Sequence, residues 1–270
     1  MSMPWEREAD IYMDLLTTSP EEVHFGVGVP GNNELQLIEC AKPGQSVLDV
    51  GCGSGENLLA LARLGYSVTG VDPSRRQLGH ASTLFREHGV HATLLELAAE
   101  RVAELVEQFD VVVSVGALHF CSDIAGVIQG ISQVIKPGGT FVLSMPHPID
   151  MLSDYEVAAD RIDVRMNSYF PSGQRIRGSR YWAKFGGKEP TGYHFDEYVY
   201  TISGLIEALS GAGFRLRSLL EPECRHEPWY PCLFKDPDPI FLTRYCASVP
   251  QYLILVAELD LGASSTGDVM

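Results

Sequence analysis

The stretch VLDVGCGSG, residues 47–55, decides the fold of this chain. Its first four residues are mostly apolar, which is typical of a strand buried on both faces of a sheet. Its three glycines let the backbone turn tightly and allow a ligand to come close to it. Residues 56–64, ENLLALARL, follow with helical spacing. The pattern therefore predicts a strand, a glycine-rich turn and a helix in succession.

A second apolar strand, predicted over residues 67–71, ends in Asp72. Asp72 follows Gly51 by about twenty positions, the spacing that places a carboxylate beside the hydroxyls of a bound ribose. A dinucleotide pattern would carry its third glycine at position 56, where this chain has Glu56, and no lysine marks a phosphate loop. With Asp49 and Asp72 at two strand ends, the site suits a nucleoside whose other end carries a cation rather than phosphates.

Residues 47–74, VLDVGCGSGENLLALARLGYSVTGVDPS, resemble motif I and the following acid of class I S-adenosylmethionine (SAM) methyltransferases. The likeness extends over about Glu21 to Glu258. Five further segments resemble the bacterial small-molecule branch that includes antibiotic N-methyltransferases of the lincosamide type: HFGVGVPGNNEL (24–35), DVVVSVGALHF (110–120), IKPGGTFVLSMPHP (135–148), SYF (168–170) and AGFRLRSLLEP (212–222). The resemblance implies an α/β Rossmann-like fold with a seven-stranded, mostly parallel sheet whose last strand is antiparallel, and SAM as the cofactor.

The length of 270 residues suits one domain with a substantial core. We expect five parts: an N-terminal helix and lid loop (1–33), a SAM-binding core (34–150), an aromatic-rich cap insert (151–200), the remainder of the core with a long loop at 225–249 (201–258), and a disordered tail (259–270). The expected strands are 47–50, 67–71, 91–95, 110–115, 140–145, 214–220 and 251–258. The expected helices are 5–16, 34–40, 56–64, 74–88, 124–135 and 201–212.

The formal net charge of −15 argues against a nucleic-acid groove, which would need clustered lysine and arginine. The six cysteines include no C-x-x-C pair, so neither a zinc site nor a redox dithiol is indicated. No stretch is long and apolar enough for a membrane span or a secretory leader. We therefore expect a cytoplasmic protein that acts on a small molecule, without a metal, a nucleic acid or a membrane; the sequence leaves its oligomeric state open.

The cofactor contacts are predicted at the carboxyl ends of the strands, where open α/β sheets bind ligands. The predicted cofactor-binding residues are Asp49, Gly51, Cys52, Gly53, Gly55, Asn57, Asp72, Pro73, Gln77, Ala98, Ser114, Val115 and Leu118. Relatives usually carry an acid for the adenine amino group at the position of Leu97. Adenine recognition is therefore expected from the Ala98 backbone, with either Glu96 or Glu100 near the amino group.

The acceptor side is predicted from aromatic residues and histidines. The predicted substrate contacts are Tyr12, His24, Phe120, Tyr169 and Phe170, and the predicted catalytic residues are His119, His147 and Tyr12. Aromatic rings can hold a sulfonium or an ammonium through cation–π attraction. A histidine with a pKa near neutral can accept the proton of an amine nucleophile. Alternatively, each histidine only hydrogen-bonds the backbone.

These residues lead to methyl transfer from SAM to a small metabolite, and nitrogen is favoured as the acceptor atom because of the family likeness. Positioning should contribute more than a general base, since alignment can supply roughly 7–11 kcal/mol and a base about 3–5 kcal/mol. Two other functions stay open. One is a SAM enzyme that cyclises SAM itself to azetidine-2-carboxylic acid and releases methylthioadenosine, and the other is a SAM-binding regulator without turnover.

Overall fold

The structure is a computed structural model, and it describes residues 5–6, 9, 20–26, 28–157, 162–170, 172–178, 195–224 and 249–262. Most of the predicted N-terminal helix, including Tyr12, lies outside the described residues. The same holds for the predicted loop at 225–249, for most of the tail at 259–270 and for part of the cap at 151–200. The core that positions the functional site is described throughout.

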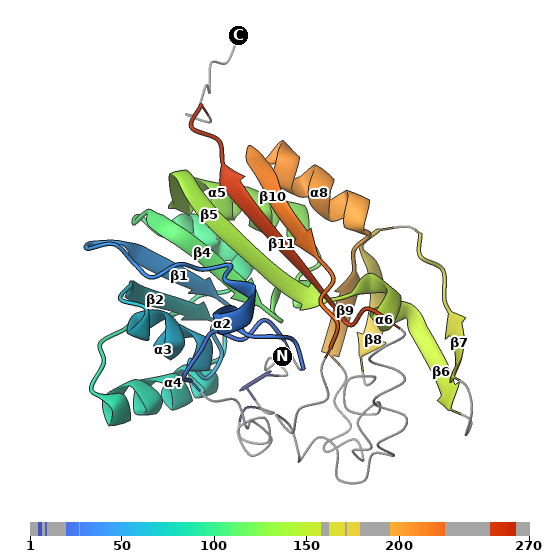
Figure 1. The fold of residues 1–270 in the computed structure, drawn as a ribbon, viewed down its shortest axis with the longest axis horizontal. Helices are drawn as coiled ribbons and strands as arrows, with labels where there is room; N and C mark the ends of the chain where they lie inside the picture. The colour runs from blue at the N-terminus through green and yellow to red at the C-terminus, as the bar shows by residue number, and fades with distance from the viewer. Residues whose placement is uncertain are drawn as a thin grey trace.

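Seven strands of the described residues form one twisted sheet (Figure 1). The order across the sheet is β10–β11–β5–β4–β1–β2–β3. The strands are β1 (Ser46–Val50), β2 (Ser67–Asp72), β3 (Thr93–Glu96), β4 (Phe109–Val115), β5 (Ile135–Pro146), β10 (Phe214–Leu220) and β11 (Tyr252–Leu259). β1 to β5 run parallel, and β11 lies antiparallel between β5 and β10. The predicted sheet, with its antiparallel last strand, is confirmed.

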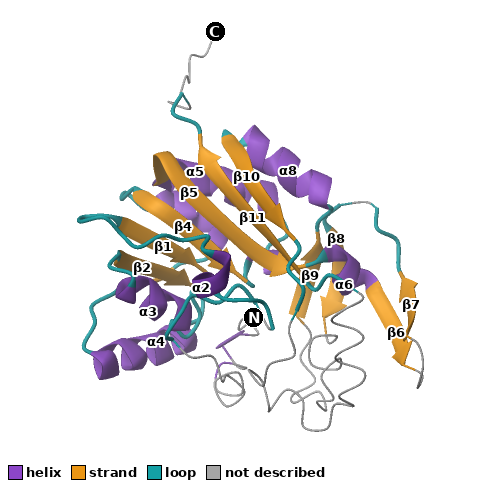
Figure 2. Ribbon diagram, in the orientation of Figure 1, coloured by secondary structure: helices purple, strands orange, loops and turns teal. Residues whose placement is uncertain are grey.

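Helices cover both faces of this sheet, so the strands are buried on both sides (Figure 2). One face carries α2 (Asn32–Leu35), α3 (Glu56–Arg63) and α4 (Arg75–His88), and the other carries the 3-10 helix η1 (Ala99–Glu104), α5 (Ile124–Val134) and α8 (Ile202–Gly211). Val47 packs in the cluster with α3, whereas its neighbour Leu48 packs in the cluster with α5. This alternation explains why the strands are continuously apolar.

Short polar side chains fix where the helices begin. Ser74 accepts a hydrogen bond from the Gln77 backbone N–H at the start of α4, and Thr201 does the same for Gly204 at the start of α8. Such N-caps satisfy backbone donors that have no partner within the helix. At its other end α4 stops at Gly89, whose φ of 65° is left-handed.

Two boundary predictions are wrong. The helix expected over 34–40 is the single turn α2, because Gln36 adopts a left-handed φ of 50° and the Asn32 side chain bonds both backbone groups of Ile38. β5 begins at Ile135 instead of residue 140. Pro137, Gly138 and Gly139, which fall between the expected helix at 124–135 and the expected strand at 140–145, lie within β5, where the pairing with β4 shifts register. A proline–glycine signal therefore marked a bulge and not the end of an element.

The described part of the cap lies beyond the carboxyl end of β5 (Figure 1). It contains α6 (Pro148–Leu152), a hairpin of β6 (Ser153–Val157) and β7 (Ile162–Met166), and a second pair of β8 (Gln174–Gly178) and β9 (Phe195–Val199). Met151, Leu152 and Val199 form a small buried cluster that joins α6 to β9. The 3-10 helix η2 (Leu118–Phe120), which follows β4, also packs against β9. These contacts bring the cap next to the end of β4.

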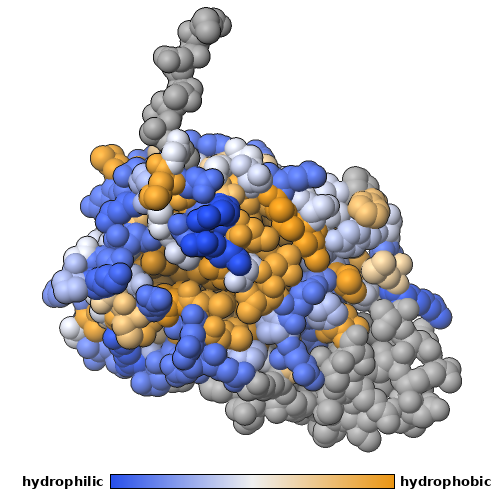
Figure 3. All heavy atoms as spheres, turned by 45° about the horizontal axis from the view of Figure 1, so that its top comes forward, coloured by the Kyte–Doolittle hydropathy of each residue, from blue (hydrophilic) through white to orange (hydrophobic). Residues whose placement is uncertain are grey.

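The surface combines polar and apolar regions. Figure 3 shows an apolar band across the middle of one face, bordered by hydrophilic residues. Among the described residues, no helix is both long enough and apolar enough to cross a bilayer.

Candidate cofactor and acceptor site

The glycine turn after β1 has the conformation that only glycine adopts easily. Gly51, Gly53 and Gly55 have φ angles of 79°, 52° and 90°. A Cβ added at Gly51 would lie 2.3 Å from the Cβ of Ala117, so this position admits no side chain. A Cβ added at Gly53 would meet nothing within 4 Å. The turn therefore presents bare backbone to open space at Gly53, which fits the close approach of a ligand.

Asp72, at the end of β2, is held against this turn. Its Oδ2 accepts a hydrogen bond from the Gly53 N–H at 3.0 Å, and its Oδ1 accepts one from the Ser74 N–H at 2.8 Å. Burial raises the pKa of Asp72, and these two backbone bonds oppose that shift. Each carboxylate oxygen can accept a further hydrogen bond. The carboxylate is thus fixed in place with capacity left for hydroxyl donors.

A second acid lies beneath the same turn. Asp49 is buried in β1, and burial raises its pKa to about 7, with the negative charges of Asp72 and Glu56 adding to the shift. The carboxylate of Glu56 accepts a hydrogen bond from Ser54 Oγ at 2.8 Å, and burial raises its pKa as well. The surroundings of the turn are therefore negative, which favours a cationic ligand over a phosphate.

Two predicted cofactor contacts of the turn region have other partners. The Asn57 side chain holds the His24 backbone at both ends: Oδ1 accepts from the His24 N–H and Nδ2 donates to the His24 carbonyl, each at 2.8 Å. The Cys52 thiol is buried next to Gly70, where an added Cβ would lie 2.7 Å from its Sγ. Asn57 thus clamps the residue 24 segment onto α3, and Cys52 packs under the turn.

The carboxyl end of β4 forms the second side of the site. Ser114 Oγ donates to the Val50 carbonyl at 2.7 Å, and the side chains of Ser114 and Leu118 are fully buried, so both residues shape the strand end. Val115 packs partly buried on the α3 face of the core. Gly116 has a left-handed φ of 64°, and an added Cβ would meet nothing within 4 Å. Gly116 and Gly53 therefore offer bare backbone at the ends of adjacent strands.

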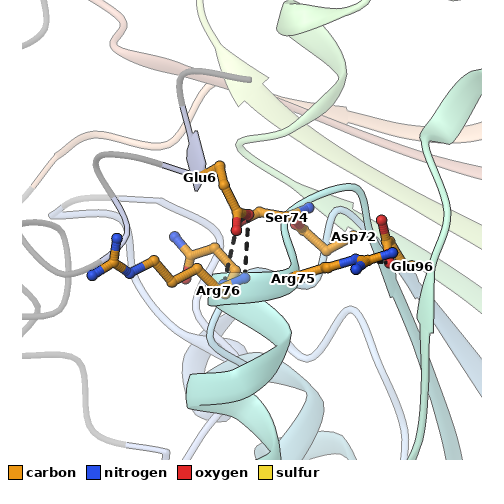
Figure 4. A network of polar contacts seen from close by, with 7 residues as sticks. Glu6, Asp72, Ser74, Arg75, Arg76 and Glu96 are labelled. Atoms are coloured by element: carbon orange, nitrogen blue, oxygen red, sulfur yellow. Dashed lines mark hydrogen bonds and ion pairs between the residues drawn. The ribbon is translucent and has the colours of Figure 1, made fainter. Parts of the chain in front are cut away.

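Of the residues predicted near the adenine, Glu96 is already bonded to another side chain. Glu96 pairs with Arg75 at 2.5 Å on the surface, so its carboxylate is tied to a cation (Figure 4). Ala98 has extended backbone and precedes η1. Gln77, on the first turn of α4, is 3 % exposed, and its Oε1 has no hydrogen-bond partner among the described residues. A buried acceptor of this kind calls for a donor, which a ligand can supply.

Two residues that the sequence analysis missed lie at this site. Glu6 Oε2 accepts hydrogen bonds from Ser74 Oγ at 2.8 Å and from the Arg76 N–H at 3.2 Å (Figure 4). The Trp5 ring lies edge-on to Phe120, with a centroid distance of 5.5 Å. The available signal was an aromatic residue and an acid at the start of the expected N-terminal helix, but nothing in their spacing identified a partner.

The two histidines have different environments. His119 is 3 % exposed, its Nδ1 has no partner among the described residues, and burial lowers its pKa to about 3. The imidazole of His147 is engaged at both nitrogens: Nδ1 accepts from the Ile149 N–H at 3.1 Å and Nε2 lies 2.8 Å from Glu221 Oε1. His147 therefore caps α6 through Nδ1, and its role as a proton acceptor stays a prediction.

The predicted aromatic residues do not form one box among the described contacts. The Tyr169 hydroxyl accepts from the Ile202 N–H at 3.1 Å, and its ring packs edge-on against Phe170, with centroids 5.0 Å apart. Phe170 is 68 % exposed. Phe120 instead contacts Trp5 and His119. In the described part of the chain, no group of three or more His, Cys, Asp or Glu residues could hold a metal ion.

A family model described as a methyltransferase domain matches residues 47–139, which cover β1 to β4 and the glycine turn. This part of the chain is therefore similar to a methyltransferase domain, in agreement with the SAM methyltransferase motifs of residues 47–74. SAM is the cofactor that these motifs predict. The residues fit it, because Asp72 has acceptor capacity beside the bare backbone of Gly53 and Gly116.

Relatives of the methyltransferase domain differ in how much of the chain they cover. An uncharacterized protein of Haemophilus influenzae is 29% identical over 204 residues, 72% of this chain and 76% of that protein. A ubiquinone biosynthesis O-methyltransferase of Rhizobium etli is 36% identical over 96 residues, so the match spans 36% of this chain and 39% of that protein. A SAM-dependent methyltransferase structure from Mesorhizobium loti has a TM-score of 0.60 at 21% identity, covering 83% of this chain and 94% of the other, and supports the fold.

Proposed function

We propose that this chain transfers the methyl group of SAM to the nitrogen of a small metabolite. The observation that carries the proposal is the row of rings formed by His119 and Phe120, which follow β4, and by Trp5. The neighbour of Trp5, Glu6, bonds to Ser74, which also bonds to Asp72 at the end of β2. Aromatic faces next to carboxylates suit a molecule that bears a protonatable amine. The acidic composition of the chain supports the same class of acceptor.

The choice of nitrogen rests on sequence motifs and on this surrounding chemistry. The solved structures that share the fold include a glycopeptide N-methyltransferase, with a TM-score of 0.50 at 16% identity, and a protein of echinomycin biosynthesis, with a TM-score of 0.56 at 18% identity. Likeness at that level supports the fold alone. The match to the Rhizobium etli O-methyltransferase spans only 36% of this chain and 39% of that protein, so its acceptor is not carried over to this chain.

When bound, SAM supplies an electrophilic methyl group on a sulfonium, and the chain's residues position it. Asp72 would accept hydrogen bonds from the ribose hydroxyls, and the bare backbone of Gly53 and Gly116 would let the cofactor lie close to the strand ends. The acids Asp49 and Asp72 favour the positive charge of the bound cofactor. Alignment of this kind can supply roughly 7–11 kcal/mol of the barrier.

His119 orients the acceptor in this proposal instead of taking its proton. An imidazole whose burial lowers its pKa to about 3 stays neutral at physiological pH and holds a proton poorly. Its neutral ring can still exchange a hydrogen bond with an amine through Nδ1. An acceptor that arrives as an ammonium would first release a proton to water. The lone pair of the neutral amine would then form the new N–C bond as the C–S bond breaks, which leaves SAH and a methylated ammonium.

Product analysis tests the proposal. The purified chain is incubated with SAM and matched panels of small amines and phenols, and both S-adenosylhomocysteine (SAH) and the methylated product are measured by mass spectrometry. We expect SAH to form only with an amine present, together with an amine heavier by one CH2 group. Methylthioadenosine in the absence of any acceptor would instead identify cyclisation, and tight SAM binding without turnover would identify a regulator.

A further inference from the structure

We propose that Trp5 and Glu6 form a strap that joins the two sides of the site, an inference that rests on the proposed function. Glu6 holds this pair of residues beside Asp72, and Trp5 forms with Phe120 a wall for an amine carried on an apolar or aromatic body. The strap would make acceptor recognition depend on the element that holds the adenosyl group. Neither residue belongs to a sequence motif that the methyltransferase assignment uses.

The Glu6 carboxylate sits at the N-terminus of α4, a helix of 14 residues. Its Oε2 accepts from the Arg76 N–H and from Ser74 Oγ, and the positive end of the helix dipole favours a carboxylate there (Figure 4). The N–H of the same Ser74 donates to Asp72 Oδ1. Ser74 therefore contacts both Glu6 and Asp72, the acid expected to bind ribose. A change in the position of Glu6 should therefore alter the position of Asp72.

The Trp5 ring continues a row of three rings. It stands edge-on to Phe120 at 5.5 Å, with an angle of 82° between the ring planes, and Phe120 lies 3.9 Å from the His119 ring. Trp5 and Glu6 are adjacent in sequence, and their Cα atoms are therefore about 3.8 Å apart. Any movement that releases Glu6 from α4 also moves the indole away from Phe120. The strap thus holds a side chain from the start of the chain against the end of β4.

The charges around this row indicate the kind of acceptor. Glu6 and Asp72 are acids close to the strap, and the Glu6 charge helps to raise the pKa of Asp72. His119 is neutral at physiological pH, so it does not repel a cation. Tryptophan is the strongest cation–π partner among the aromatic residues. An ammonium group on an apolar body matches both features, whereas an anionic acceptor would be repelled.

The contact between Glu6 and the start of α4 lies on the cofactor side of the site. It is tested by calorimetric titration with SAH. We expect Glu6→Ala to weaken SAH binding on the order of tenfold and Glu6→Gln about threefold, because the amide keeps an acceptor but loses the charge. Glu104→Ala is the matched control, since Glu104 is an acid with hydrogen bonds to Arg101 on the exposed surface. Equal SAH affinity in wild type and Glu6→Ala would overturn the strap.

The acceptor half is tested with phenethylamine and its neutral counterpart 2-phenylethanol, by ligand-observed NMR on the SAH-loaded protein. We expect phenethylamine to bind more tightly than the alcohol, to lose about tenfold in Trp5→Ala and to stay within about threefold in Trp5→Phe, which keeps a ring. Glu6→Ala should also weaken phenethylamine binding, although Glu6 contacts the cofactor side of the site. Thermal melting of each variant shows that the fold is kept.

The outcomes separate this inference from the proposed function. Wild-type protein that binds neither SAM nor SAH would overturn the proposed function itself. Normal SAH binding with unchanged phenethylamine affinity in Trp5→Ala, or with no phenethylamine binding at all, would overturn the strap as an acceptor wall. Loss of phenethylamine binding in Trp5→Ala but not in Glu6→Ala would overturn the coupling between the two halves.

Discussion

The two sides of the site are built in different ways. Around the glycine turn, the hydrogen bonds of the Asp72 and Glu56 carboxylates reach no further than 19 positions along the chain, and their donors are two backbone N–H groups and a serine hydroxyl. At the end of β4, the contacts come from distant segments: Trp5 reaches Phe120, and the Tyr200 hydroxyl donates to the Cys121 carbonyl across 79 positions. The cofactor side is therefore specified locally, whereas the acceptor side depends on how remote segments fold together.

The largest expected effect tests the local side. Asp72→Ala should weaken SAH binding by about 100-fold or more, because two ribose hydroxyls lose a charged partner at about 1.5–3 kcal/mol each. Calorimetric titration measures it. Asp110→Ala is the control, since Asp110 is also an acid bonded to a backbone N–H, that of Ser46, but lies at the amino end of β4. Similar SAH losses in both variants would mean that Asp72 acts only through stability.

The second effect compares the two histidines of the acceptor side. His119→Gln should lower kcat about 10- to 100-fold with SAH affinity within about twofold, because a misplaced acceptor can cost about 100-fold in rate. His147→Ala should leave kcat close to wild type and lower the free energy of unfolding by about 1–2 kcal/mol, the usual cost of a lost N-cap. Steady-state kinetics and urea unfolding measure both. A larger loss of kcat in His147→Ala than in His119→Gln would identify His147 as the catalytic histidine.

This contrast explains what could be predicted from the sequence. The strand, turn and acid around Asp72 were predictable, because strand period, glycine φ and helix caps are local properties. The role of Asn57 was not, since an asparagine in the first turn of a helix carries no sign that it clamps the backbone of His24. Likewise, Trp5 and Phe120 share no periodic pattern. Contacts between distant segments depend on the packing of the whole chain, so they had to be observed.

A third, smaller effect distinguishes ligand contact from backbone strain at the glycine turn of the cofactor side. Gly53→Ala and Gly89→Ala place a Cβ on left-handed residues with φ of 52° and 65°, and both added atoms point into open space. Each should lower the free energy of unfolding by about 1–2 kcal/mol. Only Gly53→Ala should weaken SAH binding, by about tenfold, because its methyl group enters the space of the ligand. Equal SAH affinities in the two variants would place the ligand away from Gly53.

The smallest expected effect is a pH dependence of cofactor binding. It should arise from the cofactor side, around the glycine turn, and not from the acceptor side at the end of β4. Burial, Asp72 and Glu56 raise the pKa of Asp49 to about 7, so Asp49 carries a proton below that pH. The cationic SAM favours the ionised form, and binding at lower pH must therefore expel a proton. SAM affinity should rise about three- to fivefold from pH 6 to pH 8, as measured by calorimetry.

Asp49→Asn isolates this titration from that of the ligand. The α-amino group of SAM also titrates near pH 8 and contributes equally in both proteins, so only the difference between their slopes reports Asp49. His119 adds nothing to the slope, since burial keeps its pKa at about 3. SAH lacks the sulfonium charge and should show a weaker dependence. The effect on folding stability has the opposite sign to the effect on SAM affinity. Because the pKa of Asp49 in the folded protein lies above its usual value, protonated Asp49 adds to the free energy of unfolding at low pH, and this contribution is lost as the pH rises through about 7. An identical slope of SAM affinity against pH in Asp49→Asn would show that the ionisation of Asp49 is not coupled to cofactor binding. Asp72 would then be the acid of the cofactor side that binds the cofactor.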